Sequence, residues 1–236
     1  MKTYRTTSGP SAEKPFYPPK DIETICIDEL RKAGFLPSSP EPIRVERFIE
    51  KKFKIHIVYD DLPDGVLGFT EFGSNGVKGM TITKTLLEEG DKVAERRINT
   101  TLAHEAGHGL LHTHLFVLGE NLQSLFGKDV DPDKPRILCR NNAIQGFQGF
   151  KGTSNPWWEI QANLVIGPLL MPKALVMTAL EPFHLKSGKL DLQRLDRSRQ
   201  EEAVKALSEI FDVNPIVAKI RLEAVFPPAQ DSQLTL

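Results

Sequence analysis

Cysteine, net charge and long apolar runs are all scarce in this chain. Only two cysteines occur among 236 residues, Cys26 and Cys139, too few for the disulfide framework of a small secreted domain. With 30 basic and 31 acidic side chains the formal net charge is −1, so charge gives no reason to expect a nucleic acid or an anionic membrane as partner. The most apolar stretch, residues 164–171, is interrupted by Gly167 and Pro168 and is far shorter than the roughly 20 residues that span a bilayer.

The N-terminal residues 1–20 lack the apolar segment of a signal peptide and contain four prolines among polar side chains. We therefore expect a flexible tail there and a cytoplasmic protein. With 40% hydrophobic and 26% charged residues, the chain is typical of a soluble globular protein with a sizeable core.

The spacing of apolar residues predicts an α+β fold that is mostly helical. Helices are expected over 21–33, 43–53, 91–115, 157–171, 198–211 and 215–225, with another after Pro172. Alternating patterns predict strands at 54–59, 66–72 and 77–83, which would form a small antiparallel three-stranded sheet. We divide the chain into a main domain over 21–190, with an insertion loop at 116–155, and a C-terminal helical region over 191–236 packed on it.

The predicted helix 91–115 contains His104-Glu105-Ala106-Gly107-His108. Four residues turn a helix by about 400°, so both imidazoles lie on one face and can reach one ion, such as zinc, at about 2.0–2.1 Å. Glu105 lies about 100° further round, where it is placed to act as the general base on a metal-bound water. The alternative is a helix with two surface histidines. Gly107 and Gly109 favour the site, because glycine inside a helix costs about 1 kcal/mol and suggests a close approach to the backbone.

A catalytic zinc also needs a third protein ligand. His112 is eight residues from His104, about 12 Å along the axis, so it is expected to be a hydrogen-bond partner at the edge of the site, and His114 an ordinary side chain. Glu159, on an otherwise largely apolar helix, is the better candidate, with Asn163 placed to orient its carboxylate. The alternative for Glu159 is an acidic residue that complements the helix dipole.

The segment 102–112, Leu-Ala-His-Glu-Ala-Gly-His-Gly-Leu-Leu-His, resembles the core motif of the ImmA/IrrE family of metallo-endopeptidases. The likeness extends to Glu-Ile-Gln-Ala-Asn at 159–163 and Leu-Leu-Met-Pro at 169–172, and the order of elements is compatible over 21–225. The resemblance implies a zincin-like domain with His104, His108 and Glu159 as zinc ligands. It also implies a protein substrate, in some members a helix-turn-helix transcriptional repressor.

The sequence differs from the family pattern in three places, and these differences bear on the shape of the substrate more than on metal binding. Asn99 and Thr100 replace an Arg-Phe pair, Val-Ile-Gly at 165–167 replaces an aromatic and alanine run, and the distance along the chain from His108 to Glu159 is long. Pro168 is expected to kink its helix.

Cys139 lies in the predicted insertion loop, where its thiolate is a candidate latency ligand for the open zinc position, as an alternative to an ordinary free cysteine. The oxyanion stabiliser is not identified, and the weak candidates are Tyr59, Arg97, His112 and Arg140.

Two functions follow from these observations. The first is a zinc-dependent endopeptidase. The second is a non-catalytic zinc protein that regulates or binds DNA, because the last two predicted helices resemble a helix-turn-helix. The second of these helices carries only Lys219 and Arg221 as cations, whereas a DNA-reading element neutralises several phosphates, so we expect a packing role for the pair.

Overall fold

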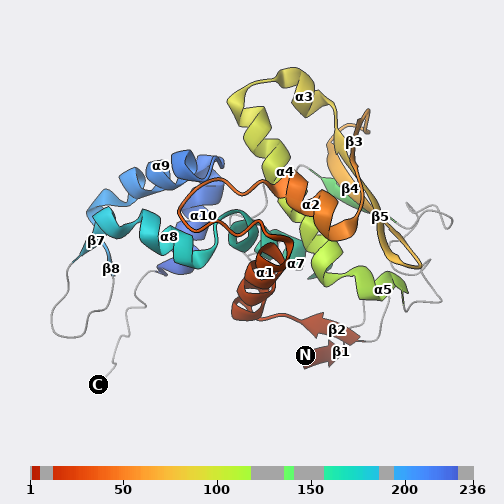
Figure 1. Cartoon of the computed structure of the whole chain (residues 1–236), viewed down its shortest axis with the longest axis horizontal. Helices are drawn as coiled ribbons and strands as arrows, with labels where there is room; N and C mark the ends of the chain where they lie inside the picture. The colour runs from red at the N-terminus through yellow and green to blue at the C-terminus, as the bar shows by residue number, and fades with distance from the viewer. Residues whose placement is uncertain (1, 6–12, 118–135, 141–156, 186–193, 228–236) are drawn as a thin grey trace.

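The computed structural model describes residues 2–5, 13–117, 136–140, 157–185 and 194–227 and confirms a mixed α+β fold that is mostly helical. Its helices are α1 (Pro19–Ala33), α2 (Val45–Phe53), α3 (Thr85–Glu89), α4 (Lys92–Leu111), α5 (Thr113–Val117), α7 (Trp157–Leu170), α8 (Lys173–Ala179), α9 (Gln200–Ile210) and α10 (Pro215–Val225). Its strands are β1 (Lys2–Arg5), β2 (Glu13–Phe16), β3 (Ile57–Asp60), β4 (Val66–Gly73), β5 (Gly76–Thr83), β6 (Arg136–Arg140), β7 (His184–Leu185) and β8 (Arg194–Leu195). In Figure 1, α4 and α7 lie between the sheet on one side and α8, α9 and α10 on the other.

The main sheet has four strands in the order β3-β5-β4-β6. The predicted all-antiparallel pairing is wrong, because β3 runs parallel to β5, while β4 is antiparallel to both β5 and β6. The connection over residues 61–65 leads from β3 to β4 and leaves a position between these two strands. Strand β5 fills that position after the hairpin turn that follows β4, and it therefore runs parallel to β3. Strand β6 was also not expected, because it lies inside the predicted insertion loop.

The N-terminal segment contains regular structure where a flexible tail is predicted. Strands β1 and β2 form an antiparallel hairpin in which Lys2 pairs with Phe16 and Arg5 with Glu13. Pro15 is buried, and its carbonyl accepts a hydrogen bond from Nε2 of Gln161 at 2.7 Å. The structure thus places two paired strands within the segment for which a flexible tail is predicted. Residues 6–12, and most of the predicted insertion loop, lie outside the described residues.

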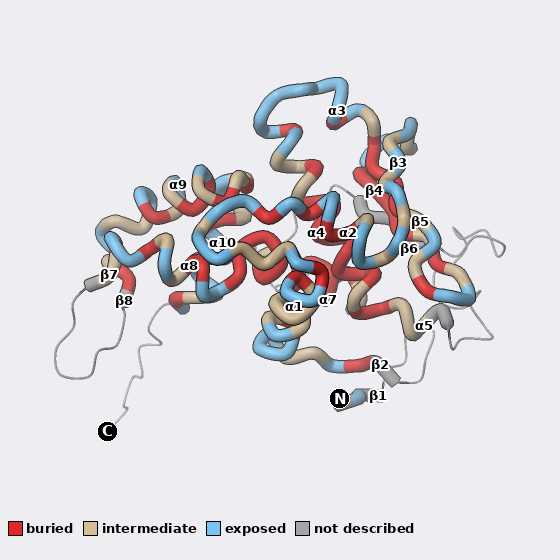
Figure 2. Tube along the Cα trace, in the orientation of Figure 1, coloured by how far each residue is buried: buried red, intermediate tan, exposed pale blue. Residues whose placement is uncertain are grey.

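Helix α4 is the central element of the fold. It begins after Asp91, whose side chain caps the helix by accepting a hydrogen bond from Ala94 N at 2.7 Å. It ends at Leu111, before the predicted end, and α5 follows. Figure 2 shows burial along most of α4 and α7, and residues 100–109 are buried without interruption. An amphipathic pattern is therefore absent from this part of the helix, because sheet and helices cover it on every side.

Helices α4 and α7 touch backbone to backbone. A Cβ atom added at Gly107 would lie 3.0 Å from both Cα and O of Ala162, and one added at Gly109 would lie 2.6 Å from Cζ of Phe53. The expected close approach at these two glycines is thus confirmed. The contact brings the motif helix against the helix that carries Glu159.

Helix α7 continues through Pro168 and ends at Leu170, and α8 follows at an angle of 49°. Among the described residues, no single helix is long and apolar enough to cross a membrane; α7 and α8 meet that test only as a bent pair. Much of α7 is buried inside the protein.

The C-terminal helices pack on the main domain and share its core, in which Leu207 and Leu222 join Leu102 in one cluster. Arg221 of α10 is buried, donates Nε to Met171 O at 2.8 Å and pairs through Nη2 with Glu23 of α1 at 2.7 Å. A buried charge must be paired, and this contact joins the first helix of the described chain to the last.

Candidate metal centre

Three donor side chains from two helices converge in the interior. His104 and His108 come from α4 and Glu159 from the first turn of α7, and their donor atoms all lie within 4.8 Å of one another. The two Nε2 atoms are 3.0 Å apart, and Oε2 of Glu159 is 3.2 Å from Nε2 of His104. Oε1 of Glu159 is 3.5 Å from Nε2 of His108. Both histidines are fully buried and Glu159 is 7% exposed.

The proton on His104 is directed away from this cluster. Oδ1 of Asn163 lies 2.9 Å from Nδ1 of His104, and an amide oxygen can only accept a hydrogen bond. Nδ1 therefore carries the proton, and Nε2 presents a lone pair to the cluster. Asn163 was expected to orient Glu159; the contact with Nδ1 makes it a partner of the first histidine.

A second chain of hydrogen bonds sets the proton on His108. Gln161 donates a hydrogen bond from Nε2 to Pro15 O, so its Oε1 faces Nε2 of His112 at 3.0 Å and accepts a hydrogen bond from it. Burial lowers the pKa of His112 well below its usual value, so the ring is neutral and its Nδ1 is an acceptor. Nδ1 of His108, 3.0 Å away, then donates to His112. Nε2 of His108 therefore carries no proton, and its lone pair is directed at Glu159. It is the second such lone pair, after that of His104 Nε2.

The cluster therefore consists of acceptors with no proton between them. Burial lowers the pKa of His108, which keeps this ring neutral. Burial acts to raise the pKa of Glu159, but positive charge at the two histidine positions outweighs burial and lowers that pKa, so the carboxylate is the favoured form wherever a cation lies beside it. Two lone pairs and one carboxylate at these separations repel one another unless a cation lies among them. The His-His-Glu group can thus hold a metal ion, and its chemistry fits one.

Glu105 lies beside this group without belonging to it. It is fully buried, its Oε2 accepts a hydrogen bond from Thr70 Oγ1 of β4 at 2.5 Å, and its Oε1 has no hydrogen-bond partner among the described residues. Burial raises the pKa of Glu105 to about 8, against the opposing effects of His104 and Thr70. A carboxylate with one anchored oxygen and one unsatisfied oxygen is suited to exchange a proton with a molecule in the site.

Each weak oxyanion candidate whose side chain the structure describes already has a partner. The hydroxyl of Tyr59 bonds to Glu46 of α2 at 3.4 Å, and Arg97 pairs with Glu89 at 3.4 Å. His112 already uses both ring nitrogens. The side chain of Arg140 lies outside the described residues.

Cys139 is placed only by its backbone, which pairs with Gly68 of β4. Its side chain lies outside the described residues, so the latency role stays a prediction.

Two positioning residues were not identified from the sequence as parts of the site. Thr70 sits in a strand 35 positions before Glu105, and Gln161 lies between Glu159 and Asn163 on a largely apolar helix. The signal for Gln161 was present, since a polar residue between buried neighbours needs a partner.

No protein-family model and no curated protein matches this chain. Its functional interpretation therefore depends on the arrangement of the donors and of Glu105.

Proposed function

We propose that this protein is a zinc-dependent endopeptidase whose metal is held by His104, His108 and Glu159. The observation that carries the proposal is the convergence of the three donors within 4.8 Å, next to a buried carboxylate that is not itself a donor. Two imidazoles and one carboxylate, with a fourth position left open, are one ligand set found in hydrolytic zinc sites. The resemblance of the two motifs to the ImmA/IrrE family supports the same assignment.

Zinc bound here would polarise the carbonyl of a peptide bond and make a water molecule more acidic. Glu105 would accept a proton at Oε1, while Thr70 holds Oε2. The pKa of about 8 in the metal-free site lies near neutrality, so the carboxyl group can both take up the proton and pass it to the leaving amine. Asn163 and His112 hold the two rings in the tautomers that bind metal.

The proposed substrate is a protein, and the resemblance favours a helix-turn-helix repressor. The alternative is a non-catalytic zinc protein that binds DNA through α9 and α10. The structure weakens the DNA-binding argument, because of the two cations on α10 only Lys219 is exposed and Arg221 is buried against Glu23.

The proposal is tested by purifying the wild type with Glu105→Gln, Glu159→Gln and the exposed control Glu209→Gln. Zinc content is measured, and cleavage of candidate repressors encoded nearby is followed by mass spectrometry. We expect Glu105→Gln to keep zinc and lose about 100-fold or more in cleavage rate, because it removes the base and no ligand. Glu159→Gln should lose zinc and activity, and Glu209→Gln neither.

Two results would count against the proposal. A wild type that holds no zinc after metal-replete purification rejects the metal centre. A zinc-loaded wild type that cleaves no candidate but binds DNA tightly favours the alternative.

A further inference from the structure

A cavity of about 790 Å³ lies between α10 and the paired helices α4 and α7, away from the metal donors. Sites for small organic ligands typically have volumes of about 300–1,000 Å³ and mostly apolar walls with a few polar groups. Ten of the twenty residues that line this cavity are apolar, including Ile166 of α7 and Ile216 of α10. Ile216 is 43% exposed, one of few large apolar side chains in the described chain that are open to solvent.

The charge of the cavity differs from that of the whole chain. Its charged lining residues are Lys20, Arg97, Lys173, Arg221 and Glu23, which is four cations against one anion, whereas the chain as a whole has a net charge of −1. The single carboxylate is already bound by Arg221 Nη2 and by the backbone N of Lys173 at 2.8 Å. Lys20 and Lys173 are both exposed and have no ion pair among the described residues.

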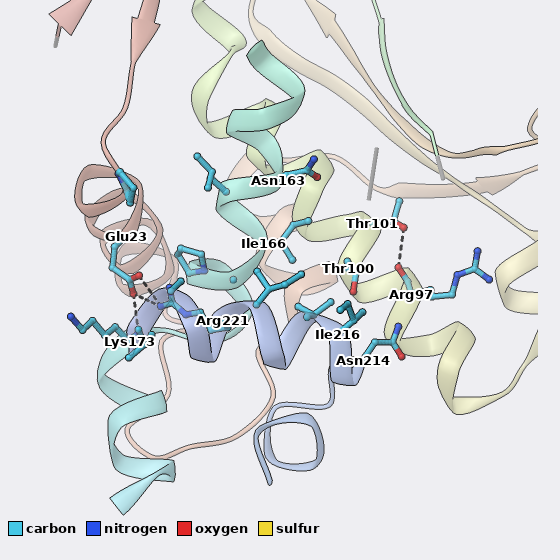
Figure 3. Close-up of a pocket in the computed structure, with 18 of the residues that line it drawn as sticks. Glu23, Arg97, Thr100, Thr101, Asn163, Ile166, Lys173, Asn214, Ile216 and Arg221 are labelled. Carbon is cyan, nitrogen blue, oxygen red and sulfur yellow. Dashed lines mark hydrogen bonds and ion pairs between the residues drawn. The ribbon is translucent and has the colours of Figure 1, made fainter. Parts of the chain in front are cut away.

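These charges are not spread evenly along the cavity. In Figure 3, Glu23, Lys173 and Arg221 gather at one end, Arg97 lies at the other end, and Ile166 and Ile216 lie between them. An elongated molecule with an apolar body and one acidic end matches this order of groups.

The cavity is separate from the metal cluster but shares a wall with it. Asn163, which contacts His104, lines the cavity one helical turn beyond Glu159, and Thr100 lines it one turn before His104. A molecule in the cavity would therefore lie behind the Nδ1 side of His104, opposite the lone pair that faces the cluster.

We propose that this cavity binds a small amphipathic carboxylate, with the acidic group near Lys20 and Lys173 and the apolar body between Ile166 and Ile216. The proposal does not depend on the peptidase assignment, because the binding is expected of the metal-free protein as well.

The test uses octanoate as the anionic probe and octan-1-ol as its uncharged counterpart. Binding of each to the full, metal-free chain is measured by titration calorimetry. The first variant, Ala224→Trp, fills the cavity from an exposed position of α10. Two further single variants, Lys20→Gln and Lys173→Gln, each remove one unpaired cation. Lys219→Gln, an exposed lysine of α10 that does not line the cavity, is the matched control.

We expect saturable octanoate binding that is tighter than octan-1-ol binding and is abolished by Ala224→Trp. Each lysine substitution should weaken octanoate about two- to fivefold, the effect of one exposed ion pair, without changing octan-1-ol. Lys219→Gln should bind as the wild type does. The proposal is overturned by an absence of saturable binding, by equal affinity for the two probes, or by unchanged binding in a folded Ala224→Trp protein.

Discussion

Gln161 joins His112 to the N-terminal hairpin: its amide oxygen faces Nε2 of His112 at 3.0 Å, while its amide nitrogen donates to the carbonyl of Pro15 at 2.7 Å. The orientation of one amide thereby decides which nitrogen of His112 carries the proton, and hence which nitrogen of His108 faces the cluster of donors. The side chain that does this is neither a ligand nor a base.

We expect Gln161→Leu to weaken zinc binding about tenfold, because hydrogen-bond partners of metal-binding histidines contribute about 10–100-fold to affinity. Competition with a chromophoric chelator measures the affinity. Gln161→Glu keeps the acceptor for His112, so its zinc affinity should be close to that of the wild type. If both substitutions reduce affinity equally while thermal unfolding is unchanged, the tautomer argument fails.

Removal of residues 1–16 should lower zinc affinity by a similar factor, because the amide of Gln161 then loses the carbonyl that orients it. Adding Gln161→Leu to the shortened chain should cause little further loss, since both changes break one chain of hydrogen bonds. Additive losses would show that the hairpin acts on the metal by another route.

Gly107→Ala should destabilise the protein by about 1–3 kcal/mol, the usual cost of overpacking, despite the better helix propensity of alanine. The new methyl group would meet Cα and O of Ala162 at 3.0 Å, and backbone atoms cannot swing aside. Gly167→Ala on α7 is the comparison, since its nearest contact is a side-chain atom, Cδ of Arg221 at 3.1 Å, and not backbone. Urea denaturation compares the two, and equal effects would mean that the helix contact is looser than described.

In the metal-free protein, Glu105→Gln should be more stable than the wild type at pH 8 and similar to it near pH 4. The folded-state pKa is raised from 4.5 to about 8, so between these values the folded chain holds a proton that the unfolded chain has released. The stability contributed by Glu105 therefore falls as pH rises through this window, by at most about 1.4 kcal/mol per pH unit, and glutamine has no such dependence. Denaturation series at several pH values measure the difference, and a difference independent of pH would contradict it.

The parts of the site that were predictable from sequence are those that local geometry determines. His104 and His108 lie on one helix, where a spacing of four residues places both rings on the same face. Glu159 lies on another helix, and spacing alone left open whether it complements the helix dipole; the resemblance to a family supplied its role. Thr70 and Gln161 act through contacts between distant segments, which periodicity does not encode.

The same distinction applies to the fold. Helices α1 and α9 carry clear apolar spacing, α1 ends at Gly34 and α10 begins at Pro215, and all three helices were predicted. The partner of a strand is a long-range property, so the parallel pairing of β3 with β5 was not. Strand β2 contains Pro15, which argues against a strand, yet a proline is tolerated in an edge position of a two-stranded hairpin.

The packing of Gly107 against Ala162 has a topological consequence. His108 and Glu159 are 51 positions apart in the sequence, and the ion that joins them would close the intervening chain into a loop, much as a disulfide does. Closing a loop of that length in the unfolded chain corresponds to about 4 kcal/mol in the chain-entropy description. Because the two helices already meet through their backbones, folding alone brings the ends of this loop together, and an ion would enter a site whose walls are assembled without it.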